Sequence, residues 1–136
     1  MATPFGVAIC YEVIYPWLVA AQVRAGASFL TTITNDAWFG HTSAPAQHFA
    51  MAVVRAAETR RWLLRAANTG ISGLVAPDGR VVAASPLFEP ALIQGSVHPR
   101  DDLTLAVRHP HGVPGACVIL LLGFAVMAAR PRRRSR

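Results

Sequence analysis

Two apolar runs near the start of the chain end abruptly in polar residues. Residues 4–9 and residues 28–34 are rich in apolar, β-branched and aromatic side chains, which predicts two buried strands. Residues 14–25 between them are predicted to form a helix, because Pro16 suits a first helical turn and Gly26 suits the position after a last one. A strand–helix–strand unit is therefore expected at the start of the chain.

A second, longer helix is predicted over residues 46–67, with Pro45 in its first turn. Arg55, Glu58 and Arg61 recur at three-residue spacing on one face of it, where we expect ion pairs that support the fold. The apolar stripe of this helix should consist of Phe49, Val53, Ala56, Ala57, Leu63, Leu64 and Ala67.

A β-hairpin is predicted after this helix. Residues 71–76 and 80–84 are largely apolar and flank a Pro-Asp-Gly turn at residues 77–79. Residues 91–97 are a candidate last strand. The predicted order of elements, β-α-β-α-β-β-β, is typical of a layered α/β domain.

The C-terminal part of the chain has a different composition. Residues 113–129 contain no charged side chain, and a helix there would be ~26 Å long, slightly less than the ~30 Å hydrocarbon core of a bilayer. Arginine-rich residues 130–136 follow, and basic residues mark the cytoplasmic side of a spanning helix. We therefore expect a domain over residues 1–108, a linker over residues 109–112, a transmembrane helix and a basic cytoplasmic tail. A buried C-terminal helix is the alternative.

The net charge of +6 comes from this tail. Five of the thirteen basic residues lie within residues 130–136, and the other eight face seven acidic residues, so the preceding domain is nearly neutral and no nucleic-acid partner is expected. All thirteen basic residues are arginine, and the chain has no lysine. Cys10 and Cys117 lie in very different surroundings, which argues against a disulfide between them.

The stretch Gly-Val-Ala-Ile-Cys-Tyr-Glu at residues 6–12 places a cysteine at the end of a predicted strand. A sharp turn from a strand into a helix pushes such a side chain out at the edge of a sheet, where the positive end of the helix favours the thiolate. Backbone N–H groups after the turn can stabilise an oxyanion. Cys10 is therefore a candidate nucleophile, and a small buried core cysteine is the alternative.

Four stretches of the sequence together resemble the carbon–nitrogen hydrolase (nitrilase) superfamily, and within it the apolipoprotein N-acyltransferase family. The resemblance extends over about residues 6–129 and includes the last transmembrane helix and the basic tail of that family. It implies the C-terminal half of a nitrilase-type α-β-β-α sandwich followed by one transmembrane helix. The stretches that carry it are residues 6–12, 34–40, 45–58 and 65–71, the last followed by the turn at residues 77–79.

The resemblance implies a Glu–Lys–Cys triad that transfers a phospholipid acyl chain, through a cysteine thioester, to the α-amine of a lipoprotein N-terminal diacylglyceryl-cysteine. The partners would be a phospholipid acyl donor, a diacylglyceryl-lipoprotein acceptor and the membrane. Neither a metal nor a cofactor is implied. The hydrolase-like domain would be periplasmic at the bacterial inner (plasma) membrane, with the C-terminus in the cytoplasm.

The same resemblance assigns roles to individual residues. Cys10 would be the nucleophile, and the backbone N–H of Tyr11 would lie near the oxyanion. Glu12 would be a carboxylate that supports the site, or simply an acid stabilised at a helix N-terminus. Trp38 and Phe39 resemble a mobile lid over the acyl-chain pocket and would bind substrate, with a place in the core as the alternative.

The sequence departs from the family in what it lacks. The glutamate base and the lysine of the triad lie upstream of the cysteine in the family, and this chain has no lysine. The first half of the sandwich and the membrane helices before it are missing too, so we expect a C-terminal fragment that is inactive alone. Two other interpretations remain open: a fragment of a soluble amidase that acts on small amides, and a non-catalytic, membrane-tethered module that binds a partner.

Overall fold

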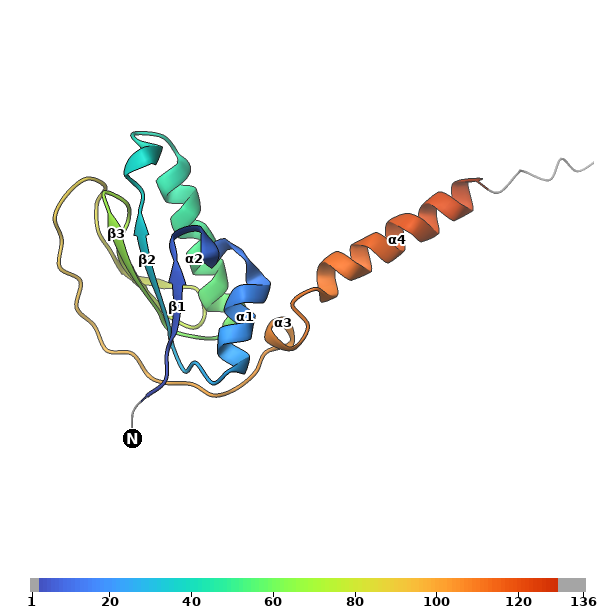
Figure 1. The fold of residues 1–136 in the computed structure, drawn as a ribbon, viewed down its shortest axis with the longest axis horizontal. Coiled ribbons are helices and arrows are strands. Elements are labelled where there is room, and N and C mark those ends of the chain that lie inside the picture. Colours follow the sequence, from blue (N-terminus) through green and yellow to red (C-terminus); the bar gives the residue numbers. More distant parts are fainter. Residues whose placement is uncertain (1–2, 130–136) are drawn as a thin grey trace, which may run out of the picture.

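A mixed five-stranded sheet lies at the centre of the domain (Figure 1). The computed structural model describes residues 3–129. The strands are β1 (Gly6–Ile9), β2 (Leu30–Asn35), β3 (Leu63–Asn68), β4 (Gly73–Val75) and β5 (Val81–Ala84). They follow one another across the sheet in chain order; β1, β2 and β3 are parallel, whereas β4 and β5 are antiparallel to their neighbours. The α/β class predicted from the sequence is confirmed.

Two helices, α1 (Pro16–Arg24) and α2 (Ala44–Thr59), connect the three parallel strands. Both connections step in the same direction across the sheet and such crossovers are right-handed, so both helices cover the same face. The helices also contact each other, and Figure 1 shows them side by side. Short 3-10 helices follow the first two strands: η1 (Cys10–Ile14) follows β1 and η2 (Ala37–Phe39) follows β2.

The hydrophobic core lies between the sheet and these helices. Alternate strand residues point into it, so Ala8, Leu30 and Leu63 are buried while their neighbours along each strand face the other way. The rest of the buried apolar cluster consists of Val13, Val19, Ala20, Val23, Phe49, Ala52, Ala56, Val75 and Val107.

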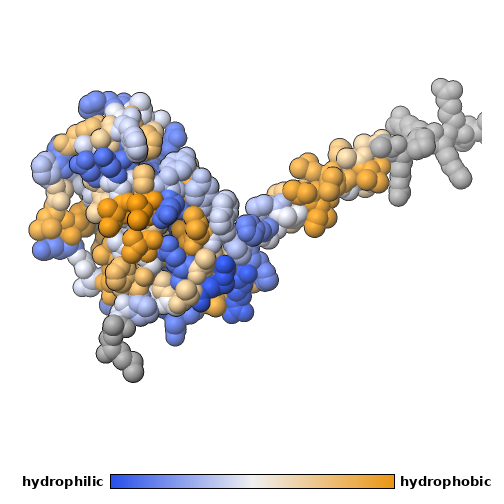
Figure 2. Space-filling model, viewed as in Figure 1, coloured by the Kyte–Doolittle hydropathy of each residue, from blue (hydrophilic) through white to orange (hydrophobic). Residues whose placement is uncertain are grey.

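The opposite face of the sheet carries exposed apolar side chains. Val7 and Ile9 on β1 and Ile33 on β2 are exposed, the last with 55% of its surface accessible. Figure 2 shows an apolar area in the region where β1 and β2 lie in Figure 1. An open apolar sheet face is typical of a layer that packs against a further layer.

The long helix predicted over residues 46–67 is wrong in its second half. Helix α2 ends at Thr59, because Arg60 adopts a left-handed conformation with φ of 52°. The following residues form β3, which pairs in parallel with β2. The sequence Leu-Leu-Arg-Ala-Ala in this segment suits a helix by propensity, but its alternate side chains are buried by the strand pairing. Tertiary contacts therefore override the local preference.

The ion pairs expected on this helix are confirmed only in part. Arg55 and Glu58 do pair, at 3.1 Å between Nη2 and Oε1. Arg61 lies beyond the end of the helix, where its Nη1 is 3.6 Å from Oδ1 of Asp102 instead. The position of Arg61 follows from the break at Arg60, which turns the chain away from the helical face.

Two further predictions about elements need correction. The first helix was expected from residue 14, but η1 occupies the residues up to Ile14 and α1 begins only at Pro16. Residues 91–97, the candidate last strand, form no strand, and β5 is the last strand of the sheet among the described residues. The hairpin is confirmed as β4 and β5, with the N–H of Gly79 donating to the Ala76 carbonyl in the turn. The predicted order of strands and helices up to β5 thus holds. Residues 63–68 form its third strand, however, and the predicted hairpin supplies the fourth and fifth strands.

A long irregular arm, residues 85–104, returns from β5 to the opposite end of the sheet. It ends at α3 (Leu105–Arg108), whose Val107 is fully buried in the core. Thr104 donates a hydrogen bond from its hydroxyl to the Glu58 carbonyl at 2.6 Å, and Arg24 donates to the Val107 carbonyl at 2.6 Å. These contacts fasten the end of the arm to both core helices.

Helix α4 (Gly112–Ala129) projects away from the domain, and Figure 2 shows that it is mostly apolar. Its side chains are exposed, including Leu120, Leu121 and Phe124. Within residues 3–129, no helix is both long and apolar enough to cross a membrane. The basic tail predicted over residues 130–136 lies outside the described residues.

Candidate active site

Cys10 stands at the carboxyl end of β1, on a sharp turn of the backbone. It is the first residue of η1 and its φ is 52°, in the left-handed region that only glycine occupies without cost. For other residues this conformation costs about 1–3 kcal/mol and persists where surrounding contacts hold it. The thiol is partly exposed and belongs to no disulfide. The structure therefore brings a free thiol to the edge of the sheet on a strained elbow.

The backbone on both sides of this thiol is held by side chains. On one side, the N–H of Ile9 donates to Oε2 of Glu12 at 2.8 Å. On the other side, the carbonyl oxygen of Cys10 lies 3.3 Å from Nε2 of His48, which belongs to α2. Glu12 is exposed and lies three residues after Ile9, so it closes the elbow locally in the manner of a capping box.

His48 is part of a buried polar cluster with Asp36 and Arg65. Its Nδ1 lies 3.1 Å from Oδ1 of Asp36 and 3.1 Å from Nη2 of Arg65. The Arg65 guanidinium also donates to Oδ2 of Asp36 at 2.9 Å, and the side chains of these two residues have no accessible surface. Thr34 donates its hydroxyl hydrogen to Oδ1 of Asp36 at 2.9 Å. The cluster thus joins the end of β2, the helix α2 and the strand β3.

The charge of Arg65 is set by burial and by its two acidic neighbours. Burial lowers the pKa of Arg65, whereas Asp36 and, to a smaller extent, the Cys10 thiolate raise it. Arg65 is therefore a buried guanidinium whose ion-pair partner is Asp36. The positive end of a long helix directly after Cys10, as expected from the sequence, is not found, because α1 begins at Pro16.

Aromatic residues flank the buried ring of His48. The ring of Tyr11 lies 5.7 Å from the imidazole, and the ring of Phe39 meets it edge-on at 5.9 Å. Both rings line a small hollow of about 70 Å³ together with Gln47 and Met51 of α2. Trp38 does not line this hollow and is 79% exposed. Phe39 thus lies at the site, while its neighbour Trp38 is a free aromatic surface.

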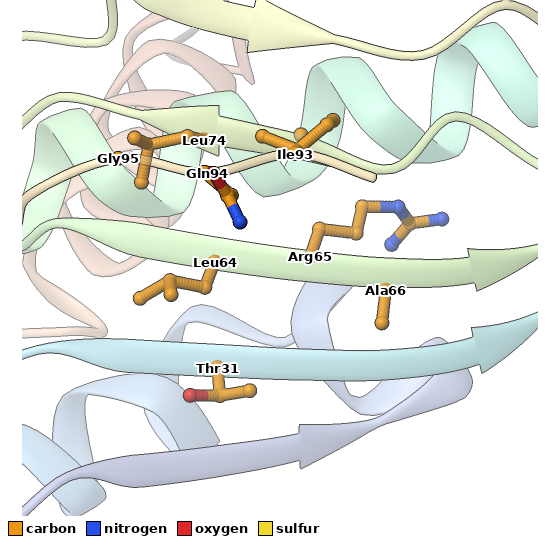
Figure 3. Close-up of a pocket in the computed structure, with 9 residues that line it drawn as sticks. Thr31, Leu64, Arg65, Ala66, Leu74, Ile93, Gln94 and Gly95 are labelled. Carbon is orange, nitrogen blue, oxygen red and sulfur yellow. The ribbon is translucent and has the colours of Figure 1, made fainter. Parts of the chain in front are cut away.

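A larger hollow, of about 460 Å³, lies where the arm passes the sheet (Figure 3). It is formed mainly by apolar residues where the arm passes the sheet, and Figure 3 shows Gln94 and Gly95 of the arm beside the strands that carry Leu64 and Leu74. Cys10 does not line it. The hollow therefore does not open at the thiol, although Arg65 of the buried cluster lines it.

Sequence reasoning selected Cys10, Tyr11, Glu12, Trp38 and Phe39. The structure places four of these residues around the elbow, whereas Trp38 does not line the hollow there. Sequence reasoning gave no role to the buried cluster of Asp36, His48 and Arg65. The helical spacing of the sequence did contain a signal for His48. This residue lies four positions, about one helical turn, before Ala52 and so falls on the buried face of α2. No such signal was available for Arg65, because its segment was assigned to a helix rather than to β3. Among the described residues, no group of three His, Cys, Asp or Glu side chains could hold a metal ion.

Solved structures of two proteins share this fold. One is Nit3 of Saccharomyces cerevisiae, a member of branch 10 of the nitrilase superfamily, with a TM-score of 0.55 and 25% identity over 63% of this chain and 34% of its own. The other is an amidase from Nesterenkonia sp., with a TM-score of 0.53 and 23% identity over 82% of this chain and 42% of its own. The second likeness is one of fold alone.

Sequence relatives agree with this fold. The apolipoprotein N-acyltransferase of Geobacter metallireducens is 44% identical over 95% of this chain and 24% of its own length. That of Azotobacter vinelandii is 42% identical over 92% of this chain and 24% of its own length. The chain thus spans about a quarter of these relatives. Residues 2–101 match the carbon–nitrogen hydrolase family as a whole. With a partly exposed cysteine on a strained elbow at the end of β1 and this match over most of its length, the chain belongs to the carbon–nitrogen hydrolase family.

Proposed function

We propose that the chain supplies the cysteine nucleophile of an apolipoprotein N-acyltransferase. The observation that supports this most directly is Cys10 itself: a free, partly exposed thiol on a left-handed backbone that side chains hold from both sides. Strain of this kind clusters at active sites. Similarity to named apolipoprotein N-acyltransferases gives the substrate class.

The proposed reaction has two steps. The Cys10 thiol gives its proton to a base, and its sulfur attacks the ester carbonyl carbon of a phospholipid. A C–S bond forms, the ester C–O bond breaks, and the leaving oxygen takes up the proton as a lysophospholipid departs. The α-amine of a lipoprotein N-terminal diacylglyceryl-cysteine then attacks the thioester. A C–N bond forms, the C–S bond breaks, and the amine proton returns to the sulfur.

Groups near the elbow would assist both steps. We assign the backbone N–H of Tyr11 to the developing oxyanion, because it follows the nucleophile directly in η1. Glu12 holds the Ile9 peptide and so preserves the conformation of the elbow. Phe39, at the rim of the hollow over His48, and the exposed Trp38 would cover the acyl chain.

The remaining members of the triad would come from outside this chain. The family resemblance calls for a glutamate base and a lysine, and the sequence contains no lysine. The open sheet face with Val7, Ile9 and Ile33 would pack against the second sheet of a nitrilase-type sandwich. We therefore propose that the 136-residue chain alone does not transfer acyl groups.

Helix α4 would attach the domain to the membrane. Residues 113–128 are exposed and uncharged, and an arginine-rich segment follows the helix in the sequence. Such an arrangement favours insertion with the basic end on the cytoplasmic side, which would place the domain on the periplasmic side of a bacterial inner membrane.

Complementation tests the proposed function. The chain is expressed with an apolipoprotein N-acyltransferase of Geobacter metallireducens from which the matching segment has been deleted. We expect a phospholipid-derived acyl adduct on Cys10, seen by mass spectrometry, and N-acylation of a diacylglyceryl-cysteine peptide. Cys10→Ala should abolish both, and the matched control Cys117→Ala, on exposed α4, should change neither.

Two results would contradict the proposal. Acyl transfer by the 136-residue chain alone would show that it needs no outside residues. An acyl adduct that persists in Cys10→Ala, or transfer without any adduct on Cys10, would show that Cys10 is not the nucleophile.

Vesicle flotation tests the attachment by α4. Leu121→Arg places a charge in the middle of the helix, at a cost of about 2.5–3.5 kcal/mol if that position lies in the bilayer, so the fraction of protein that floats with phospholipid vesicles should fall. Val82→Arg, an exposed position on β5, is the matched control and should leave flotation unchanged. Equal flotation of both variants would exclude α4 as the attachment.

A further inference from the structure

The elbow at Cys10 needs support that η1 does not supply by itself. A left-handed conformation of a non-glycine residue is unfavourable and relaxes unless neighbouring groups hold it. Glu12 holds the peptide before Cys10, but it is exposed and belongs to the same short turn. The backbone carbonyl of Cys10 itself contacts a side chain from a different element, His48 of α2.

The direction of this hydrogen bond follows from the chemistry of its partners. A carbonyl oxygen carries no hydrogen, so the contact of 3.3 Å between the Cys10 carbonyl and Nε2 of His48 requires a hydrogen on Nε2. His48 therefore donates to the backbone of the nucleophile. Its Nε2–H points at the carbonyl rather than at a substrate, so His48 acts on Cys10 through the backbone.

His48 in turn has little freedom to move. It is 2% exposed, its Nδ1 lies within 3.1 Å of both Asp36 and Arg65, and Tyr11 and Phe39 flank its ring. Asp36 and Arg65 are themselves locked together by a buried ion pair at 2.9 Å. The donor Nε2 is thus fixed relative to β2, β3 and α2 at once, as a rigid support requires.

We propose that His48 is a positioning residue that holds Cys10 in its reactive conformation by donating Nε2–H to the Cys10 carbonyl, with Asp36 and Arg65 fixing the imidazole. The proposal deepens the proposed function, because it takes Cys10 as the nucleophile. It predicts that the reactivity of the Cys10 thiol depends on a donor at the position of Nε2, and not on an aromatic ring at residue 48.

Two substitutions separate these possibilities. His48→Gln keeps an amide donor near the position of Nε2, whereas His48→Asn keeps polar atoms near Nδ1 for Asp36 and Arg65 but is too short to reach the Cys10 carbonyl. The rate of alkylation by iodoacetamide is measured on the full 136-residue chain in detergent micelles, with the adducts on the two cysteines resolved by mass spectrometry. Cys117, exposed on α4, is the internal control in every sample.

We expect Cys10 to react faster than Cys117 in the unaltered chain. His48→Asn should slow Cys10 roughly tenfold, the effect of one lost hydrogen bond of about 1.4 kcal/mol, and His48→Gln should restore the rate to within about threefold. The Cys117 rate should stay the same throughout. Hydrogen exchange of the amides of residues 9–13 should accelerate in His48→Asn and not in His48→Gln, while exchange in β2 stays unchanged.

The positioning role would be overturned if neither variant differed from the unaltered chain in the rate of Cys10 alkylation or in hydrogen exchange at residues 9–13. Equal slowing by Asn and Gln would also overturn it, because only the ring would then matter. Neither result depends on acyl transfer, so the positioning role and the proposed function can fail separately. If His48 supports Cys10 but Cys10 is never acylated in the complemented enzyme, only the proposed function is refuted.

Discussion

At the scale of single residues, the buried pair of Asp36 and Arg65 carries the greatest energetic consequence. The two side chains have no accessible surface and meet at 2.9 Å. Removing one partner of such a pair leaves an uncompensated buried charge, which costs more than the pair contributes. Among the described residues, Asp36 is the only carboxylate that forms an ion pair with Arg65. The pair thus makes the site sensitive to a change far from the thiol.

We expect Asp36→Asn to lower the free energy of unfolding by about 3–5 kcal/mol, since Arg65 keeps its charge and loses its partner. Urea denaturation followed by circular dichroism measures the change. Asp78→Asn is the matched control, because the Asp78–Arg80 pair is two-thirds exposed at 3.9 Å, and it should change the free energy by less than about 0.5 kcal/mol. A loss below about 1 kcal/mol in Asp36→Asn would contradict this account of the cluster.

At the scale of elements, the end of α2 decides how the domain is built. Residues 44–67 contain enough apolar and helix-favouring side chains for a continuous helix, yet the helix ends at Thr59. The break at Arg60 lets Arg61 donate to the Ala27 carbonyl at 2.9 Å and lets β3 pair with β2. No glycine or proline marks this break, so a local pattern could not reveal it.

Arg60→Gly should leave the protein as stable as before or raise its free energy of unfolding by up to about 1 kcal/mol, because glycine adopts the left-handed conformation without strain. Arg60→Val removes the same weak contact with Asp102 but adds a branched side chain at φ of 52°, and should lower the free energy by more than about 1 kcal/mol. Thermal unfolding compares them. Equal effects of glycine and valine would show that the conformation at residue 60 is not what matters.

The arm belongs to the same scale, since it is held to the domain by charge. A hydrogen bond from Arg100 lowers the pKa of Asp102, and Arg61 contributes in the same direction. A depressed carboxyl pKa stabilises the folded state above the ordinary aspartate pKa of 3.8, and this contribution is lost as the pH falls through the lowered value.

The unaltered chain should therefore have a higher free energy of unfolding than Asp102→Asn at neutral pH, and this difference should shrink steadily below about pH 4. Urea unfolding midpoints between pH 7 and pH 2 measure it. The neighbouring Asp101→Asn, with no hydrogen bond from Arg100 to lose, should show a smaller advantage at neutral pH. A difference in the free energy of unfolding that grows on acidification would contradict a lowered pKa of Asp102.

At the scale of the whole molecule, the domain is a sheet with helices on one face only. The covered face contains the core, while the open face presents Ile9, Ile33 and Val7 to the outside. Helix α4 adds a second apolar surface that the domain does not cover. The site lies at the end of the open face, because Cys10 directly follows Ile9 at the end of β1.

Ile33→Lys tests whether the open face needs its apolar side chains for the fold of this chain. Ile33 is 55% exposed, so the substitution should change the free energy of unfolding by less than about 1 kcal/mol. The matched change on the covered face, Leu63→Ala at a residue 1% exposed, should cost about 2–5 kcal/mol. In the complementation experiment, Ile33→Lys should nevertheless reduce acyl transfer, because it would put a charge between two packed sheets.

A large loss of stability in Ile33→Lys alone would show that this face is already covered in the isolated chain. Unchanged acyl transfer in the complemented enzyme would show that no second sheet packs on it.

The sequence by itself determined the features that depend on neighbours along the chain. Local periodicity and turn residues predict the first two strands, the first of which ends directly before Cys10. They also predict the hairpin around residues 77–79 and the apolar segment that forms α4. The resemblance of its motifs also pointed to the family. It selected Cys10, Tyr11, Glu12 and Phe39, which lie together at the elbow, and Trp38, which does not line the hollow there.

Only the tertiary structure decided the rest. Whether residues 63–68 form a helix or a strand depends on pairing with β2, more than 25 residues earlier in the chain, so propensity could not settle it. The support of Cys10 by His48, Asp36 and Arg65 was hidden for the same reason, because these residues come from three elements and meet only when the sheet assembles. A buried polar cluster drawn from three elements is a property of packing in three dimensions, and no local pattern records it.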